Sequence, residues 1–433
     1  MTSLRHPSEA HTRQTRAADF ARETGLRASL RRLLDMPVTS YYLVFISVLA
    51  LIGFGLIMVL SASSISAYRA GEGSSFSVFY RQGLYAVIGV ALMIGLSYVP
   101  VAWFKKTASI VFLGAVVLQT LPLVPGLGHE VQGNAGWIRV GGFQGQPAEF
   151  TKIALAVWLA TFFAYKSAKL GSLREILPAL IGLTVVLGLV LAGRDLGTAI
   201  IVVATALGTV FVAGLPWKYL ITAFLGIAAV VAALVLTSAN RMARIRAMFA
   251  GHDTDAMDPL GQHWQSNHGL FALASGGWFG VGLGASREKW LWLPEAHNDF
   301  IFAIIGEELG LLGSGAVLLL FSVLGFGLIR IVLRTEDRMV QAAVAGIFMW
   351  FIGQALVNIG VVSGVLPVIG VPLPFVSYGG SALLATCMAA GIVLAFARAE
   401  SGAKEAMRAQ SARVRESLAV LASSPLRLRK KRT

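Results

Sequence analysis

The chain has 433 residues, of which 56% are hydrophobic and only 13% are charged, and its mean hydropathy is +0.72. Soluble domains carry roughly 25% charged residues, so this composition excludes an ordinary soluble protein and indicates one that crosses a membrane several times. The net charge of +14 does not indicate nucleic-acid binding, because the basic residues lie in tails and in short loops between apolar segments. The single cysteine, Cys387, excludes an intrachain disulfide and a cysteine metal cluster.

Ten apolar segments follow a polar, Arg-rich tail that has no cleavable signal pattern. Each is long enough to cross a membrane core, which needs roughly 20 residues. Their approximate bounds are 41–62, 80–99, 108–125, 148–165, 175–193, 196–214, 218–237, 300–329, 340–364 and 379–398. We therefore expect an all-α polytopic membrane protein with about ten transmembrane helices, a membrane domain at 41–398, and basic tails at 1–40 and 399–433.

The short loops set the expected orientation, because Lys and Arg gather on the cytoplasmic side. Lys105, Lys106, Arg330 and Arg334 lie in loops that are on the same side as the N-terminus. Both termini are then cytoplasmic. The extracytoplasmic side holds four loops, of which the largest lies between the seventh and eighth helices: 63–79, 126–147, 238–299 and 365–378.

One stretch, LPEAHNDFIFAIIGEELG at 293–310, combines polar groups with the start of the eighth apolar segment. The polar residues directly before that segment are Glu295, His297, Asn298 and Asp299, and two further acids, Glu307 and Glu308, lie about two turns inside it. Acids at the mouth of a membrane helix are costly, and they indicate function. The alternative is that Asn298 or Asp299 only caps the helix.

The second outer loop and the fourth segment read GNAGWIRVGGFQGQPAEFTK. A Gly-rich backbone beside Trp137 and Arg139 allows a ligand to approach closely. Glu149 and Lys152 are three residues apart on the expected helix, so they either pair with each other or contact a substrate. Arg194 and Asp195 form a charge pair between the fifth and sixth segments. This pair either staples the helix hairpin, with Asp195 capping the sixth helix, or contributes to a site.

Two more loops carry candidate ligands. Arg241, Arg244 and Arg246 lie in the largest outer loop, against the usual charge bias, and their guanidinium groups suit a pyrophosphate or anionic lipid headgroups. The loop before the last segment contains prolines at 367, 372 and 374, which exclude a regular helix. Its small polar residues either line a cavity or serve packing alone: Ser377, Tyr378, Gly379, Gly380 and Ser381.

Four motifs and their order among the ten segments resemble the SEDS family, over about residues 40–398. The motifs are LPEAHNDFIFAIIGEELG, LPFVSYGGSAL, QPAEFTK and RDLGTA. These are the shape, elongation, division and sporulation proteins, peptidoglycan glycosyltransferases that polymerise lipid II. The IIGEELG ending and the long basic N-terminal tail look more like the division branch than the elongation branch.

The resemblance implies that Asp299 is the general base of an inverting sugar transfer on the extracytoplasmic side of the plasma membrane at the septum. It also implies help from a divalent cation, magnesium or manganese, although no ligand cluster is assignable from the sequence. The predicted substrate-binding residues are Lys152, Arg139, Arg244, Arg246, Gln265, Glu295, His297, Ser377 and Tyr378. The predicted supporting residues are Glu149, Asp195, Trp137, Gly379 and Gly380.

Two departures from the family pattern concern substrate contacts. The family often has Arg directly before the Trp of the second outer loop, where this chain has Gly136. A Gln-Ser pair of the large loop is replaced by His268 and Gly269, whereas Gln265 matches the pattern.

The expected partners are lipid II, the growing polyprenyl-linked glycan, a class B penicillin-binding protein and other membrane proteins of the division complex. A lipid II flippase is the main alternative function, and a scaffold without chemistry of its own is a third.

Overall fold

The computed structural model describes residues 36–69, 74–131, 133–141, 143–166, 172–237, 262–290 and 292–409, besides the single residues 25, 28 and 242. Most of the two predicted tails therefore lies outside the described residues, as do the predicted phosphate ligands Arg244 and Arg246.

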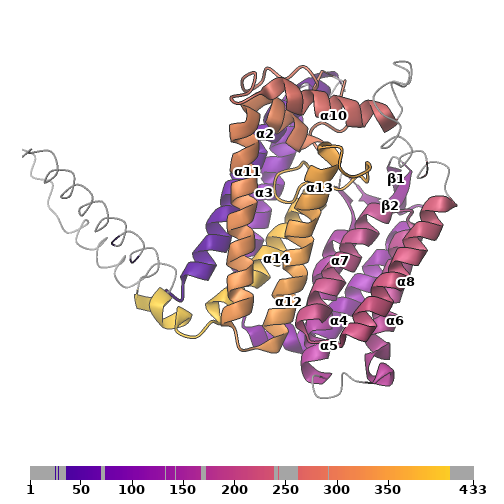
Figure 1. Ribbon diagram of the computed structural model, residues 1–433, viewed down its shortest axis with the longest axis vertical. Helices are drawn as coiled ribbons and strands as arrows, with labels where there is room; N and C mark the ends of the chain where they lie inside the picture. Colours follow the sequence, from indigo (N-terminus) through magenta and orange to yellow (C-terminus); the bar gives the residue numbers. More distant parts are fainter. Residues whose placement is uncertain are drawn as a thin grey trace, which may run out of the picture.

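A helix occupies each of the ten predicted apolar segments, and these helices stand side by side as a bundle (Figure 1). Their bounds are α2 Thr39–Arg69, α3 Ser77–Ser97, α4 Val101–Thr120, α5 Pro147–Lys166, α6 Leu173–Ala192, α7 Leu196–Val212, α8 Trp217–Leu236, α11 Ile301–Arg334, α12 Arg338–Phe348 with α13 Gln354–Val362, and α14 Gly380–Arg398. A single π-helical turn, Met349–Gly353, joins α12 to α13.

Among the described residues, eight helices are long and apolar enough to cross a membrane. The two that fall short are α7, Leu196–Val212, and the apolar part of α8, Trp217–Ala233. The chain is thus a multi-pass membrane protein, as its composition predicts, whereas the count of ten spans stays a prediction.

Two apolar clusters form the interior of the bundle. One joins α2, α3, α11, α12, α13 and α14, and the other joins α4, α6, α7 and the start of α8. Helix α5 contributes Ala156 to the first cluster and Leu155 to the second, so it stands between them. Small residues allow close approach: a Cβ at Gly391 of α14 would lie only 2.6 Å from the Met93 carbonyl oxygen of α3.

The start of α2 and the end of α14 lie at the same end of the bundle. The Ser40 hydroxyl, at the start of α2, donates a hydrogen bond to Glu400 just after α14 (3.4 Å), and it accepts one from Arg330 Nε of α11 (3.0 Å). This arrangement requires an even number of crossings between the start of α2 and the end of α14.

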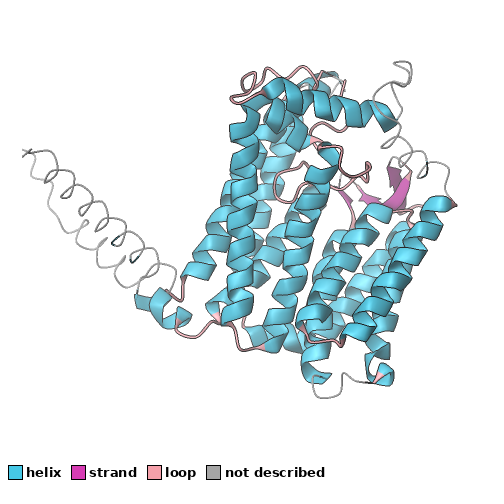
Figure 2. Cartoon of the chain, in the orientation of Figure 1, coloured by secondary structure: helices cyan, strands magenta, loops and turns pink. Residues whose placement is uncertain are grey.

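The second outer loop, for which the sequence predicted no strands, folds as a small antiparallel sheet at the opposite end of the bundle (Figure 2). Its strands are β1 Gly128–Val131, β2 Asn134–Val140 and β3 Phe143–Gly145, in the order β1-β2-β3. The large outer loop also contains a helix, α10 Gln262–Gly276. The expected loops therefore hold structure of their own.

The eighth segment is not the continuous helix that the sequence predicts. Gly310 interrupts α11 with φ 66° and ψ −159°, a conformation that is essentially restricted to glycine. The outer-loop segment 277–282 fills this break and pairs with the backbone groups that an unbroken helix would have joined to each other. Four hydrogen bonds do so: Leu311 N to Gly277 O (2.9 Å), Leu312 N to Trp278 O (3.3 Å), Val281 N to Glu307 O (2.9 Å) and Gly282 N to Glu308 O (3.1 Å).

The two acids before the break hold the same loop through their side chains. The buried Glu308 carboxylate accepts hydrogen bonds from Lys289 Nζ (2.8 Å) and from the Ser61 hydroxyl of α2 (2.6 Å). The Glu307 carboxylate accepts from the Ser286 hydroxyl (2.5 Å) and from Arg287 N (2.8 Å). Both acids are therefore structural groups that join the outer loop to α11 and α2.

Candidate functional site

A cavity of about 860 Å³ opens at the end of the bundle that carries the small sheet. Its walls come from segments far apart in the sequence: α3, β2, the starts of α5 and α7, part of α8, the loop before α11, and the loop 365–379. Most of the predicted site residues meet there, namely Trp137, Arg139, Glu149, Lys152, Asp195, Glu295, His297, Asp299, Tyr378, Gly379 and Gly380.

Asp299 lies in the loop directly before α11 and lines the cavity. Phe300 holds the N-cap position of α11, so neither Asn298 nor Asp299 is the N-cap residue that the capping alternative requires. The Asp299 carboxylate borders the loop 365–379 so closely that a Cβ at Gly370 would lie 3.5 Å from Oδ2. A partly exposed carboxylate at a cavity wall can accept a proton from a bound hydroxyl group.

Hydrogen bonds fix the Asp299 loop to the loop 365–379. Asn358 Nδ2 donates to the carbonyl oxygens of Asp299 and Val371, each at 2.8 Å. The Ser377 hydroxyl donates to Asn298 O at 2.7 Å, and Tyr378 N donates to His297 O at 3.0 Å. The prediction that Ser377 lines the cavity is wrong, because its buried side chain instead ties the two loops together.

His297 and Glu295 form part of the wall beside Asp299. The His297 ring lies 5.4 Å from the Tyr378 ring, centroid to centroid. Burial lowers the pKa of His297, and the Glu295 carboxylate opposes this only in part. The ring is therefore uncharged at neutral pH, so His297 can donate or accept hydrogen bonds without adding positive charge.

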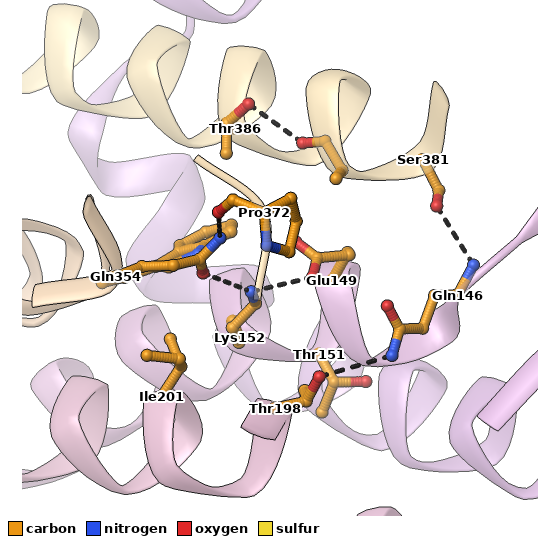
Figure 3. A network of polar contacts seen from close by, with 12 residues as sticks. Gln146, Glu149, Thr151, Lys152, Thr198, Ile201, Gln354, Pro372, Ser381 and Thr386 are labelled. Carbon is orange, nitrogen blue, oxygen red and sulfur yellow. Dashed lines mark hydrogen bonds and ion pairs between the residues drawn. The ribbon is translucent and has the colours of Figure 1, made fainter. Parts of the chain in front are cut away.

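Lys152 is buried in the floor of the cavity, inside a network of polar groups (Figure 3). Its ammonium group lies 2.9 Å from the Glu149 carboxylate and 3.2 Å from Gln354 Oε1, and 4.4 Å from the centre of the Trp350 ring. The predicted Glu149–Lys152 pair is thus confirmed. Because the pair is neutral as a whole, Lys152 adds little net charge for an anionic substrate, and its substrate contact stays a prediction.

Gln146 joins three of the elements around the cavity. Its side-chain amide donates to Asp195 Oδ2 at 2.6 Å, and its backbone N donates to the Ser381 hydroxyl at 3.1 Å (Figure 3 shows this second contact). Asp195 caps α7, since its carboxylate also accepts from Thr198 N at 2.8 Å. The capping interpretation of Asp195 is therefore confirmed.

Trp137 and Arg139 lie two residues apart on β2, so both side chains project from the same face of the sheet, and both line the cavity. By contrast, Gln265 lies on α10 and is not part of the cavity wall, so the structure does not bring it to the predicted site.

The sequence analysis missed several residues that line the cavity, among them Arg81, Arg194, Gln146 and Gln354. Gln354 had a usable signal, because an amide inside an apolar segment is costly unless it has partners. Arg81 and Gln146 lie at segment edges, where polar residues are common, so the sequence alone does not single them out.

In the part of the chain that the structure describes, no three His, Cys, Asp or Glu side chains lie close enough to hold a metal ion. Glu295 and Asp299 both line the cavity, yet they do not form such a group with a third ligand. The described residues therefore do not fit a metal site made by the protein alone.

Comparison with known proteins relates the chain to one family. A family model described as a cell cycle protein, that of FtsW, RodA and SpoVE, matches residues 41–402. A probable peptidoglycan glycosyltransferase FtsW of Mycobacterium tuberculosis is 38% identical over 377 residues, which cover 87% of this chain and 71% of that protein. Stage V sporulation protein E of Bacillus subtilis is 39% identical over 360 residues, which cover 82% of this chain and 96% of that protein.

Solved structures have the same fold. A chain from a study of the structural coordination of polymerization and crosslinking by a peptidoglycan synthase complex matches with a TM-score of 0.67 and 28% identity, over 82% of this chain and 96% of that chain. The rod shape determining protein RodA of Thermus thermophilus matches with a TM-score of 0.61 and 26% identity, over 83% of this chain and 97% of that chain.

Proposed function

This chain belongs to the FtsW, RodA and SpoVE family of cell cycle proteins, and we propose that it is a peptidoglycan glycosyltransferase that polymerises lipid II with Asp299 as its general base. One observation carries the assignment of the base. The Asp299 carboxylate lies on the wall of a large cavity, in a loop that hydrogen bonds hold to a second loop. General bases need this combination of access and fixed position.

The proposed reaction is a single displacement. The 4-hydroxyl oxygen of an acceptor GlcNAc attacks C1 of a MurNAc that carries a polyprenyl pyrophosphate. The new oxygen–C1 bond forms as the bond from C1 to the pyrophosphate breaks, and the leaving pyrophosphate keeps the electron pair. Asp299 takes the hydroxyl proton. Attack from the opposite face converts the α-linked donor into a β-1,4 product.

Charge develops on the leaving pyrophosphate, and fixed cations stabilise it. Arg139 supports this role because it lines the cavity with its side chain exposed. Magnesium is commonly held by one or two carboxylates together with substrate phosphates. We therefore propose that a divalent cation, magnesium or manganese, enters with the substrate, and no step above depends on it.

The proposed location of this reaction is the extracytoplasmic face at the septum. The cavity lies at the end of the bundle opposite to the start of α2 and the end of α14. The basic loops and tails favour a cytoplasmic position for that other end.

We also propose a class B penicillin-binding protein as partner, in line with the solved relative from a peptidoglycan synthase complex. An apolar groove of about 340 Å³ between α11 and the α12–α13 pair would take the single membrane helix of such a partner. Its lining includes Phe321, Gly325, Phe326, Ile352 and Leu356.

A flippase remains the main alternative. The polar residues that line the cavity gather at one end of the bundle, and the interior next to them consists of the two apolar clusters. This arrangement supports chemistry at one face of the membrane rather than a polar path across it.

The test of the proposed function is polymerisation of purified lipid II by the full-length protein with its class B partner. Asp299→Asn removes the base and keeps the shape, and the Asp299 carbonyl still accepts from Asn358. We expect the rate of strand formation to fall by about 10²- to 10⁴-fold. The control is Asp337→Asn, an aspartate that pairs with Lys105 away from the cavity.

Near-normal strand formation by the Asp299→Asn protein would refute the assignment of the base. If wild-type protein makes no strands but moves labelled lipid II between leaflets, the flippase reading is favoured instead. If the protein without residues 1–35 still polymerises, a pure scaffold is excluded.

A further inference from the structure

Arg194 lies in the turn between α6 and α7 and lines the same cavity as Asp299. Its backbone has φ 62°, in the left-handed region that non-glycine residues rarely adopt. Its side chain is exposed, and it makes no hydrogen bond or ion pair with any residue that the structure describes. A strained turn therefore presents an unpaired guanidinium group to the cavity.

The adjacent acid does not form an ion pair with Arg194. Asp195 is buried, and its two carboxylate oxygens are engaged by Thr198 N (2.8 Å) and Gln146 Nε2 (2.6 Å). The two neighbours thus have separate roles, one as a helix cap and one as a cavity wall. The guanidinium of Arg194 keeps its donors available for an anion, and Arg suits phosphate because those donors form a planar fork.

Packing places the turn that carries Arg194 near Asp299. Gly197, the second residue of α7, lies so close to the loop 365–379 that a Cβ there would stand 2.7 Å from Ile369 O. The next residue of that loop, Gly370, borders the Asp299 carboxylate. The α6–α7 turn and the general base therefore flank the same short piece of chain.

The same turn packs against the sheet at Gly136. A Cβ at Gly193 would lie 3.2 Å from Gly136 Cα, and Ala135 N donates to Gly193 O at 2.9 Å. Gly136 leaves no room for a side chain here, because a Cβ would lie 2.9 Å from Asn134 Oδ1, which accepts a hydrogen bond from Gly136 N. The turn that carries Arg194 therefore packs closely against β2 at the edge of the cavity, beside the cavity-lining residue Asn134.

We propose that Arg194 binds a phosphate of the polyprenyl pyrophosphate substrate. The proposal rests on the proposed function for the identity of the anion. It assigns Arg194 to substrate binding, in place of the structural charge pair with Asp195.

The test measures binding rather than turnover. Full-length protein in detergent is titrated with polyprenyl pyrophosphate and, separately, with the uncharged polyprenol of the same length. We expect Arg194→Gln to weaken pyrophosphate binding by about 10- to 100-fold, the effect of losing charged hydrogen bonds, and to leave polyprenol binding unchanged. Arg194→Lys should fall between, because it keeps the charge and loses the fork.

The matched control is Arg174→Gln, an exposed arginine in the first turn of α6, at the other end of the same helix. Equal pyrophosphate affinities for Arg194→Gln and Arg174→Gln would overturn the proposal, as would an equal loss of polyprenol binding.

Failure of this proposal can be separated from failure of the proposed function. If the wild-type protein binds pyrophosphate through Arg194 but makes no strands, the phosphate site is supported and the glycosyltransferase assignment is refuted. If the wild-type protein makes strands and the Arg194→Gln variant binds pyrophosphate normally, the glycosyltransferase assignment is supported and the role of Arg194 is refuted.

Discussion

Among single residues, charge within an apolar context was a good guide to the site, and small polar residues were not. Asp299, Arg139 and Lys152 stand out in the sequence because charges at membrane edges are costly, and all three line the cavity. Ser377 gave no such signal, because the direction of a small hydroxyl depends on loop packing. The sequence suggested that Arg194 pairs with Asp195, whereas in the structure Asp195 caps α7 and Arg194 lines the cavity.

The buried pair of Lys289 and Glu308 yields a prediction at this scale. Lys289→Met leaves the fully buried Glu308 carboxylate without its cation. Breaking such a pair costs about 3–5 kcal/mol, so we expect a clear drop in the thermal unfolding midpoint in detergent. The control, Lys105→Met, removes a half-exposed partner of Asp337, where about 0–1 kcal/mol is at stake. Equal drops for both variants would contradict a structural role for the Lys289–Glu308 pair.

At the level of helices and strands, the apolar segments predicted the membrane helices well, because long apolar runs have few alternatives in a bilayer. The small sheet was missed because β1 and β3 have only four and three residues, too short for an alternating pattern to stand out. The break in α11 was missed for a different reason. The run GEELGLLGSG contains four glycines in a helical context, and only the contact with the loop 277–282 decides which one leaves the helix.

Gly310→Ala tests the break. A Cβ at this position would lie 2.4 Å from Gly280 N and 2.6 Å from the Trp278 carbonyl carbon, and its φ is positive. We expect lower stability and loss of polymerisation, since the loop that fills the break leads on to Asp299. Gly315→Ala on the same helix meets nothing within 4 Å, and it should be neutral or stabilising by up to about 1 kcal/mol. Thermal unfolding and strand formation measure both; a neutral Gly310→Ala would mean that the break is dispensable.

For the molecule as a whole, the cavity lies where the two apolar clusters meet, with α5 between them. Sequence order alone does not reveal this meeting point, because the walls come from residues as far apart as Arg81 and Ala382. The family resemblance predicted the function, while the pairing of loops around Asp299 required the three-dimensional structure.

The groove between α11 and the α12–α13 pair yields the prediction at this scale. A Cβ at Gly325 would lie 3.4 Å from Phe348 and 3.5 Å from Ile352, so Gly325→Leu fills the groove without a clash. We expect less class B partner to copurify and less stimulation of polymerisation by it. Gly188→Leu, on the exposed face of α6 with nothing within 4 Å, is the control. Unchanged copurification with Gly325→Leu would place the partner elsewhere.

The exchange of backbone hydrogen bonds at Gly310 has a consequence for the dynamics of the outer loop. Opening the segment 277–282 would leave the amides of Leu311 and Leu312 and two carbonyls of α11 unpaired at the membrane edge. The amide protons of this segment should therefore be among the slowest in the outer loop to exchange with solvent.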